Sequence, residues 1–284
     1  MKIGSRFKQN RDRKGAFRIA FSNTVLILVF AACVFAQSPV APPVVGLIRD
    51  SARAVRPVIG LAGNFILGDA VKTGVISAAF SSSAGIVKTD SELLAIDTQN
   101  RVLATLDAPA GRALISFLSN SEAIIYLEQN QTLLRWNGSS FDSLPFDPTQ
   151  FAGGIVSVAF AGSQAVNFLV QRADGLWLLQ SDVSTGSIQS AQALPGLSAP
   201  ALVMADGSLL YTDSGALVLR RADVSESRFS LSGDVASFEQ MNDEWVHIHE
   251  RDGPRRGAGR DFALHLTKGA EQLYELPHVA HESQ

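Results

Sequence analysis

The chain has 284 residues, of which 46% are hydrophobic and 18% are charged, with a formal net charge of −3. This composition is typical of a globular protein with a substantial core, and it excludes a chain that is disordered throughout. Cys33 is the single cysteine, so no disulfide can form within one chain.

The first 36 residues read as a secretory signal peptide. Residues 1–18 carry seven basic side chains against one acid, and the uncharged stretch that follows ends in small residues before Gln37. These are the charged, apolar and cleavage regions of such a signal. Two alternatives stay open. The uncharged stretch is about 18 residues long, near the lower limit for an uncleaved membrane anchor. In addition, Phe30-Ala31-Ala32-Cys33 resembles the lipobox of bacterial lipoproteins, with Phe30 where leucine is usual.

Cleavage after Ala36 would change the charge of the protein. It would leave 17 basic and 26 acidic residues, a net charge of −9. An acidic protein lacks the basic face that phosphate contacts need, which argues against a nucleic-acid partner. We therefore expect a secreted or periplasmic protein, which meets a membrane only if the segment stays uncleaved or Cys33 is lipidated.

Two apolar runs follow a short linker over residues 37–43. They cover residues 44–49 and 55–59 and predict a pair of strands. Pro57 lacks the N–H that a strand ladder needs, so we expect the second run at an outer edge of its sheet. We interpret the glycine-rich stretch 60–68 as a connection.

Short apolar runs then recur with a period of about 40 residues. The clearest set begins at Leu93, Leu133, Leu176, Leu217 and Phe262. Each belongs to a group of four runs separated by Asx-Gly and other polar turns, which are strong hairpin signals. A repeat of this length built from short strands is typical of a β-propeller blade. From the inside outward, the expected strands are 74–80, 85–88, 93–97 and 102–106; 113–118, 123–127, 133–136 and 141–144; 155–160, 165–170, 176–179 and 188–191; 199–204, 209–212, 217–220 and 228–231; and 234–238, 245–249, 262–266 and 272–276.

The sequence thus predicts an all-β fold, with a β-propeller domain over residues 44–279 and a short tail at 280–284. Five full repeats plus the initial pair favour six blades with an incomplete N-terminal blade, and five blades is the alternative. Over residues 44–277 the repeats resemble those of bacterial exported β-propeller proteins, without the sequence motif of any particular family. The resemblance implies no function, because propellers host enzymes and binding scaffolds alike.

Three of the five histidines fall within the last repeat. His247 and His249 are two apart on a strand and so point to the same face, and His265 lies on the next strand. Three convergent imidazoles can hold zinc, which makes these residues the candidate metal site. The alternative is that they are ordinary solvated histidines. No other cofactor is indicated.

Two further features have both a functional and a structural interpretation. The longest hairpin loop, residues 250–261, contains four arginines and is either an arm that binds an acidic ligand or a solvated insertion. Asp97, Asp174, Asp213 and Asp252 recur near hairpins, and we interpret them as turn formers rather than as a ring of ligands.

Three hypotheses of function follow, and none rests on a catalytic motif. We favour an exported, non-catalytic propeller that binds a protein or a glycan. The second is a hydrolase or lyase with its site at the mouth of the central channel. The third is a membrane-tethered assembly factor.

Overall fold

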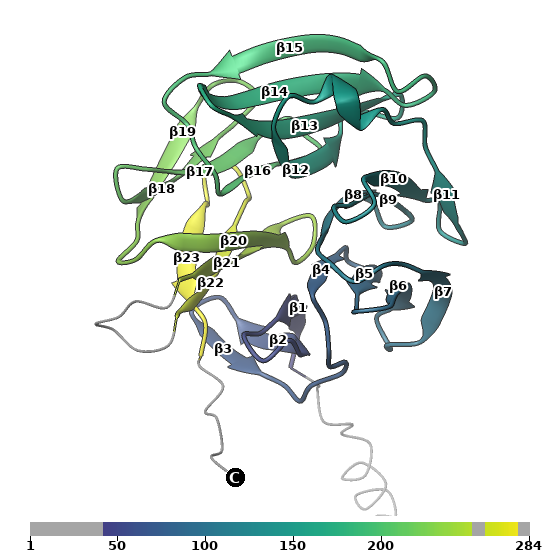
Figure 1. The fold of residues 1–284 in the computed structure, drawn as a ribbon. Helices are drawn as coiled ribbons and strands as arrows, with labels where there is room; N and C mark the ends of the chain where they lie inside the picture. Colours follow the sequence, from purple (N-terminus) through teal and green to yellow (C-terminus); the bar gives the residue numbers. More distant parts are fainter. Residues whose placement is uncertain (1–41, 252–258, 278–284) are drawn as a thin grey trace, which may run out of the picture. The chain divides into compact units, whose positions relative to one another are not determined.

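The computed structural model describes residues 42–251 and 259–277. The expected signal peptide, most of the linker and the tail at 280–284 lie outside these residues. Within the unit Pro43–Gln284, six antiparallel sheets follow one another around a ring (Figure 1). The prediction of a six-bladed β-propeller is confirmed. The one helical element among the described residues is the 3-10 turn η1 (Pro148–Gln150).

Each of the last five sheets has four strands in chain order, and each strand expected in these repeats is present. The inner strands, which contact the inner strands of other sheets, are β4 (Ser77–Phe80), β8 (Ala113–Ser119), β12 (Gly154–Phe160), β16 (Ala201–Val203) and β20 (Val235–Gln240). The second strands are β5 (Ala84–Lys88), β9 (Glu122–Leu127), β13 (Ala165–Arg172), β17 (Leu209–Asp213) and β21 (Trp245–Glu250). The third strands are β6 (Glu92–Asp97), β10 (Thr132–Trp136), β14 (Gly175–Asp182), β18 (Ala216–Arg220) and β22 (Asp261–His265). The outer strands are β7 (Val102–Asp107), β11 (Phe141–Ser143), β15 (Ile188–Leu194), β19 (Glu226–Ser230) and β23 (Gln272–Glu275).

The N-terminal sheet is incomplete, as predicted, but it has three strands rather than two: β1 (Val44–Arg49), β2 (Val55–Leu61) and β3 (Asn64–Leu67). The stretch that we interpreted as a connection contains β3. The expectation of an outer edge for the second run is wrong, because β2 is the middle strand. Pro57 fits there because the ladder to β3 begins at Val58, and the Pro57 carbonyl accepts a hydrogen bond from Gly68 N at 2.9 Å.

The direction of β1 shows which strand the first sheet lacks. The start of β1 meets residues that follow β20, since Asn242 Nδ2 donates to the Val45 carbonyl at 2.6 Å. The end of β1 reaches back into β20, where Arg49 pairs with Glu239. Strand β1 therefore runs antiparallel to β20, as a second strand does.

The described first sheet accordingly has a second, third and outer strand but no inner one. Directly before β1, the described residues Pro42 and Pro43 lack the N–H that a strand ladder needs.

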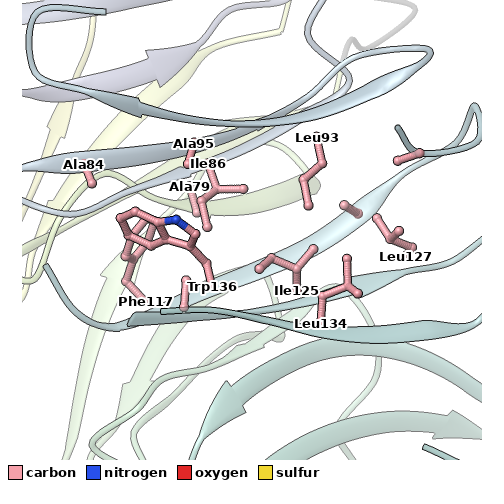
Figure 2. Close-up of a cluster of buried hydrophobic side chains, with 13 residues drawn as sticks. Ala79, Ala84, Ile86, Leu93, Ala95, Phe117, Ile125, Leu127, Leu134 and Trp136 are labelled. Atoms are coloured by element: carbon pink, nitrogen blue, oxygen red, sulfur yellow. The ribbon is translucent and has the colours of Figure 1, made fainter. Parts of the chain in front are cut away.

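Each pair of neighbouring sheets shares one cluster of buried apolar side chains. Figure 2 shows the cluster between the second and third sheets, where the Trp136 ring meets Phe117 edge to face at a centroid distance of 6.1 Å. Ile86 and Ile125 pack nearby in the same cluster. The core of the ring is thus divided among the interfaces between sheets.

The interface between the sixth and first sheets closes the ring. Phe65 of β3 packs edge to face against Trp245 and Tyr274, with ring centroids 5.8 and 5.7 Å away. No strand of the described chain is shared between the two sheets, so side chains alone hold this closure.

Candidate functional site

A polar pocket of about 250 Å³ lies where the inner strands begin. All five inner strands line it, and its polar side chains are Ser77, Arg112, Ser157, Ser237, Glu239 and Arg251. We call it the inner-strand pocket. A second cavity of about 400 Å³ is lined by residues at the opposite ends of β8, β16 and β20.

A side-chain bond spans the ring between the two cavities. Gln240 Oε1, at the end of β20, accepts a hydrogen bond from the backbone N–H of Phe117 in β8 at 3.0 Å. These strands belong to the sixth and third sheets, which are not neighbours. This bond therefore links inner strands on opposite sides of the ring, beside the second cavity.

Two buried serines join neighbouring inner strands at this pocket. Ser77 Oγ accepts from Ala113 N at 3.1 Å, and Ser157 Oγ accepts from Val203 N at 3.0 Å. Each hydroxyl oxygen thereby uses one of its two lone pairs in the protein. Neither hydroxyl donates a hydrogen bond to another described residue, so both can donate to a ligand.

Two exposed arginines stand at the pocket, and we call them the arginine rim. Arg112 directly precedes β8, and Arg251 directly follows β21. Neither guanidinium has a hydrogen-bond or ion-pair partner among the residues the structure describes. The charge of Arg112 opposes the effect of burial on Glu128, whose pKa is raised because burial disfavours its charged form.

A chain of charged groups, the seam cluster, runs from the pocket into the interface between the sixth and first sheets. It consists of Arg49, Glu239, His247, His249 and Asp261. Arg49 Nε donates to Glu239 Oε1 at 2.9 Å. Glu239 Oε2 lies 3.9 Å from His247 Nδ1, and His247 Nε2 lies 2.8 Å from Asp261 Oδ1. His249 Nδ1 contacts the same Asp261 oxygen at 2.8 Å.

The protonation of the seam cluster follows from its packing. Burial disfavours the charged ring of His247, but the carboxylates of Asp261 and Glu239 outweigh burial and raise its pKa to about 9. Burial likewise opposes the charge of both carboxylates. The two histidines nevertheless lower the pKa of Asp261, and Arg49 with His247 lowers the pKa of Glu239. Opposite charges therefore alternate from Arg49 through Glu239 and His247 to Asp261 at neutral pH.

The structure does not bring the three predicted zinc ligands together. His247 and His249 share Asp261, whereas His265 bonds to Ala270 O and Thr267 Oγ1 and stacks on Trp245 with a centroid distance of 4.6 Å. Among the described residues, no three His, Cys, Asp or Glu side chains are placed to hold a metal ion. Zinc binding by His247, His249 and His265 stays a prediction.

An ion pair between Glu250 and Arg260 joins the two ends of the arginine-rich loop. Residues 252–258 lie outside the described part of the chain. Glu250 is buried and accepts hydrogen bonds from Gly233 N at 2.9 Å and Ser232 N at 3.1 Å. Arg260 Nη2 donates to Glu250 Oε2 at 3.0 Å. Two of the four arginines in this loop, Arg251 and Arg260, lie in the described part of the chain. Arg260 is the one that forms an ion pair within the fold.

Of the recurring aspartates, Asp97 shows the backbone contacts of a turn former, whereas Asp174 accepts a hydrogen bond from the Trp177 ring N–H at 3.0 Å. Asp97 Oδ1 accepts from the backbone N–H groups of Gln99 and Arg101, both at 2.9 Å. These bonds, with the Arg101 side chain, lower the pKa of Asp97. Asp213 instead bonds to Ser214 and Arg228, and Asp252 lies outside the described residues.

Comparison with known proteins supports the fold and leaves the family open. No protein-family profile matches the chain, and no curated protein matches it in sequence. The chain is similar in structure to TolB from Acinetobacter baumannii, with a TM-score of 0.54 and 14% identity over 80% of this chain and 62% of TolB. It is also similar to a streptogramin B lyase structure (TM-score 0.41, 14% identity, 75% and 77% covered) and to a nidogen/laminin complex (TM-score 0.49, 8% identity, 82% and 93% covered). At these identities the similarity shows a propeller fold alone.

No helix among the described residues has the length and apolar character needed to cross a bilayer.

Proposed function

We propose that this protein is an exported propeller that binds a protein or a glycan at the face where the inner-strand pocket opens. The arginine rim carries this proposal. Two guanidinium groups without a partner in the described chain stand at a concave polar site, and such groups favour an external ligand over further folding contacts. The second cavity differs, because its one arginine, Arg221, is already paired with Glu271 at 3.0 Å. Export is inferred from residues 1–36 of the sequence.

Site-specific photo-crosslinking tests which face binds. A photoreactive residue replaces Gln129, an exposed residue that contacts Gly111 just before the arginine rim, or Asp243, which lines the second cavity. We expect one partner to be captured from position 129 in the native organism, and not from position 243. The purified partner should then bind the purified propeller with a measurable Kd. Capture from position 243 alone would contradict the proposal.

A hydrolase or lyase is the second candidate, and Glu239 is the observation that favours it. This carboxylate lines the pocket and lies beside a protonated histidine, an arrangement that could move a proton. However, Glu239 Oε2 and His247 Nδ1 are both enclosed without a hydrogen-bond partner. A substrate would have to displace the contact with Arg49 to reach them, so we rank binding first. Turnover that disappears in Glu239→Gln would reverse this order.

Tethering to a membrane as an assembly factor depends on residues outside the described range. Mass spectrometry of the native protein distinguishes the cases. A mature N-terminus at Gln37 is the outcome expected for an exported binding protein, while an intact N-terminus or a lipidated Cys33 would support tethering.

A further inference from the structure

We infer that the inner-strand pocket binds a carboxylate group of a protein partner, either a chain terminus or one acidic side chain. This inference rests on the proposed function and names the chemistry that the pocket recognises.

The pocket has a surplus of donors. Arg112 and Arg251 bring guanidinium groups that have no partner in the described chain. Ser77 and Ser157 are 6% and 3% exposed, and each accepts one backbone N–H, so each keeps its hydroxyl hydrogen and one oxygen lone pair. The two guanidinium groups can only donate, so a ligand that satisfies them must supply acceptors, and a carboxylate supplies two oxygens with about four lone-pair sites.

The single acidic side chain of the pocket does not cancel this preference. Glu239 is ionised, but Arg49 and His247 flank it, and both are positively charged at neutral pH. The side chains at and behind the pocket therefore sum to a positive charge. An arginine–carboxylate pair is strengthened in such a place, because two parallel N–H bonds can form to one planar anion.

Size and overall charge favour a single carboxylate on a protein. A space of about 250 Å³ holds about one or two residues of a peptide, not a long chain. The net charge of the protein is −3, and −9 after the expected cleavage at Ala36, which disfavours approach of a polymer with many negative charges. A partner with little net charge that presents one carboxylate is attracted by the positive charge at the pocket and is not repelled by the net negative charge of the protein.

Peptide binding to the complete secreted protein tests the inference. The probes are an acetylated tetra-alanine peptide with a free C-terminal carboxylate, the same peptide as its C-terminal amide, and an amidated peptide with one glutamate. We expect the two acidic peptides to bind with chemical-shift changes in Ser77 and Ser157, and the neutral amide to bind at least 10-fold more weakly. Added salt should weaken binding of the acidic peptides.

Matched variants identify the groups responsible. We expect Arg112→Gln and Arg251→Gln each to weaken the acidic peptides about 10-fold, as befits the loss of one charge-assisted hydrogen bond. Ser77→Ala should weaken them several-fold. Arg101→Gln is the control, because Arg101 is another exposed arginine but pairs with Asp97 on β6, and it should leave binding unchanged. Within the described chain neither guanidinium makes a hydrogen bond or ion pair that its replacement would remove, and the thermal stability of each variant checks that Glu128 tolerates the loss of the Arg112 charge.

Several outcomes would overturn the inference. They are equal binding of the neutral amide, no binding of either acidic peptide at millimolar concentration, no effect of the two rim variants, or binding of a hexuronate tetramer in place of the peptides. If the partner captured from position 129 still binds both rim variants, the inference fails while the proposed function stands. Capture from position 243 alone would remove the proposed function itself.

Discussion

His247 carries a charge inside the protein because two carboxylates face its ring. Its side chain is 2% exposed, an environment that would normally keep an imidazole neutral. Asp261 accepts a hydrogen bond from the Nε2–H group of His247, and Glu239 lies near Nδ1, so the ionised ring is the favoured form. Removing His247, Asp261 or Glu239 leaves a buried charge without its counter-charge. The free-energy cost of that charge exceeds the net stabilisation that an intact buried ion pair provides.

The stability of the protein should therefore depend on the pH through His247. Its folded pKa of about 9 lies above the value of about 6.5 in an unfolded chain, so its contribution is complete below pH 6.5 and is lost as the pH rises through 9. The depressed pKa values of Asp261 and Glu239 act in the opposite direction. Their contribution is present above about pH 4 and is lost in acid.

We predict that the free energy of unfolding falls by about 3 kcal/mol more between pH 6.5 and 9.5 in the wild-type protein than in His247→Gln. Urea denaturation across this range measures the difference. His265→Gln, which removes a histidine outside the seam cluster, should keep the wild-type profile. A flat profile in the wild-type protein would mean that His247 is neutral.

The zinc prediction is tested at the same residues by a different measurement. Metal analysis of the purified protein should find stoichiometric zinc if His247, His249 and His265 form a site. The zinc should then be lost in the His247→Ala/His249→Ala double variant. The contacts of His265 with Thr267 and Ala270 would have to be exchanged for the metal, so we expect less than 0.1 zinc per chain from the geometry described here.

Only part of the seam cluster can be predicted from the sequence. Period-two alternation places His247 and His249 on one face, where both contact Asp261. The sequence pattern leaves Asp261 one residue before an expected strand and Glu239 one residue beyond another. Arg49 comes from the opposite end of the chain, and no local pattern can show that ring closure brings it to Glu239.

Among the elements, the interfaces between sheets decide stability. Trp136 of β10 is 1% exposed and fills the space between the second and third sheets beside Phe117 (Figure 2). Its Nε1–H group has no hydrogen-bond partner in the described chain, so the contribution of this side chain comes from packing alone.

We predict that Trp136→Ala lowers the free energy of unfolding by about 3–5 kcal/mol, the range for deleting a large aromatic side chain from a core. Trp136→Phe should cost much less, because it keeps a ring in the interface and removes a buried N–H without a partner. Chemical denaturation of the two variants makes the comparison. A similar loss in both would show that Nε1 does find a partner.

The N-terminal sheet shows where strand counting fails. Third strands begin at residues 92, 132, 175, 216 and 261, and β2 begins at 55, a step of 37 before the first of them. The repeat period thus assigns β2 to the third position and β1 to the second, with no inner strand among the described residues of this sheet. Counting strands outward from the first apolar run misses this offset, because hairpin signals give strand order but not which position in the blade comes first.

At the scale of the whole molecule, the ring closes without a strand shared between the first and last sheets of the described chain. Arg49 with Glu239, Asn242 with Val45, and the Phe65 cluster hold the two sheets together. Closure thus depends on side chains that are almost 200 residues apart in sequence, where a covalent link should have a large effect on stability.

A disulfide across this closure is the test. A Cβ atom added to Gly46 lies 3.2 Å from the Cβ of Met241, close to the 3.5–4.5 Å typical of a disulfide. In a Cys33→Ser background, we predict that Gly46→Cys/Met241→Cys oxidises spontaneously and raises the free energy of unfolding by up to about 5 kcal/mol, the chain-entropy value for so long a loop. Urea denaturation with and without reductant measures the gain.

The control pair tests the direction of β1 as well as the closure. Arg49→Cys/Met241→Cys moves one cysteine three residues along the strand, about 10 Å away, which is too far for a disulfide. If β1 were instead an inner strand running parallel to β20, its first residues would meet the start of β20 and the Gly46 pair would not form. Oxidation of the Gly46 pair alone therefore requires both that the first and last sheets adjoin and that β1 occupies the second position in its blade.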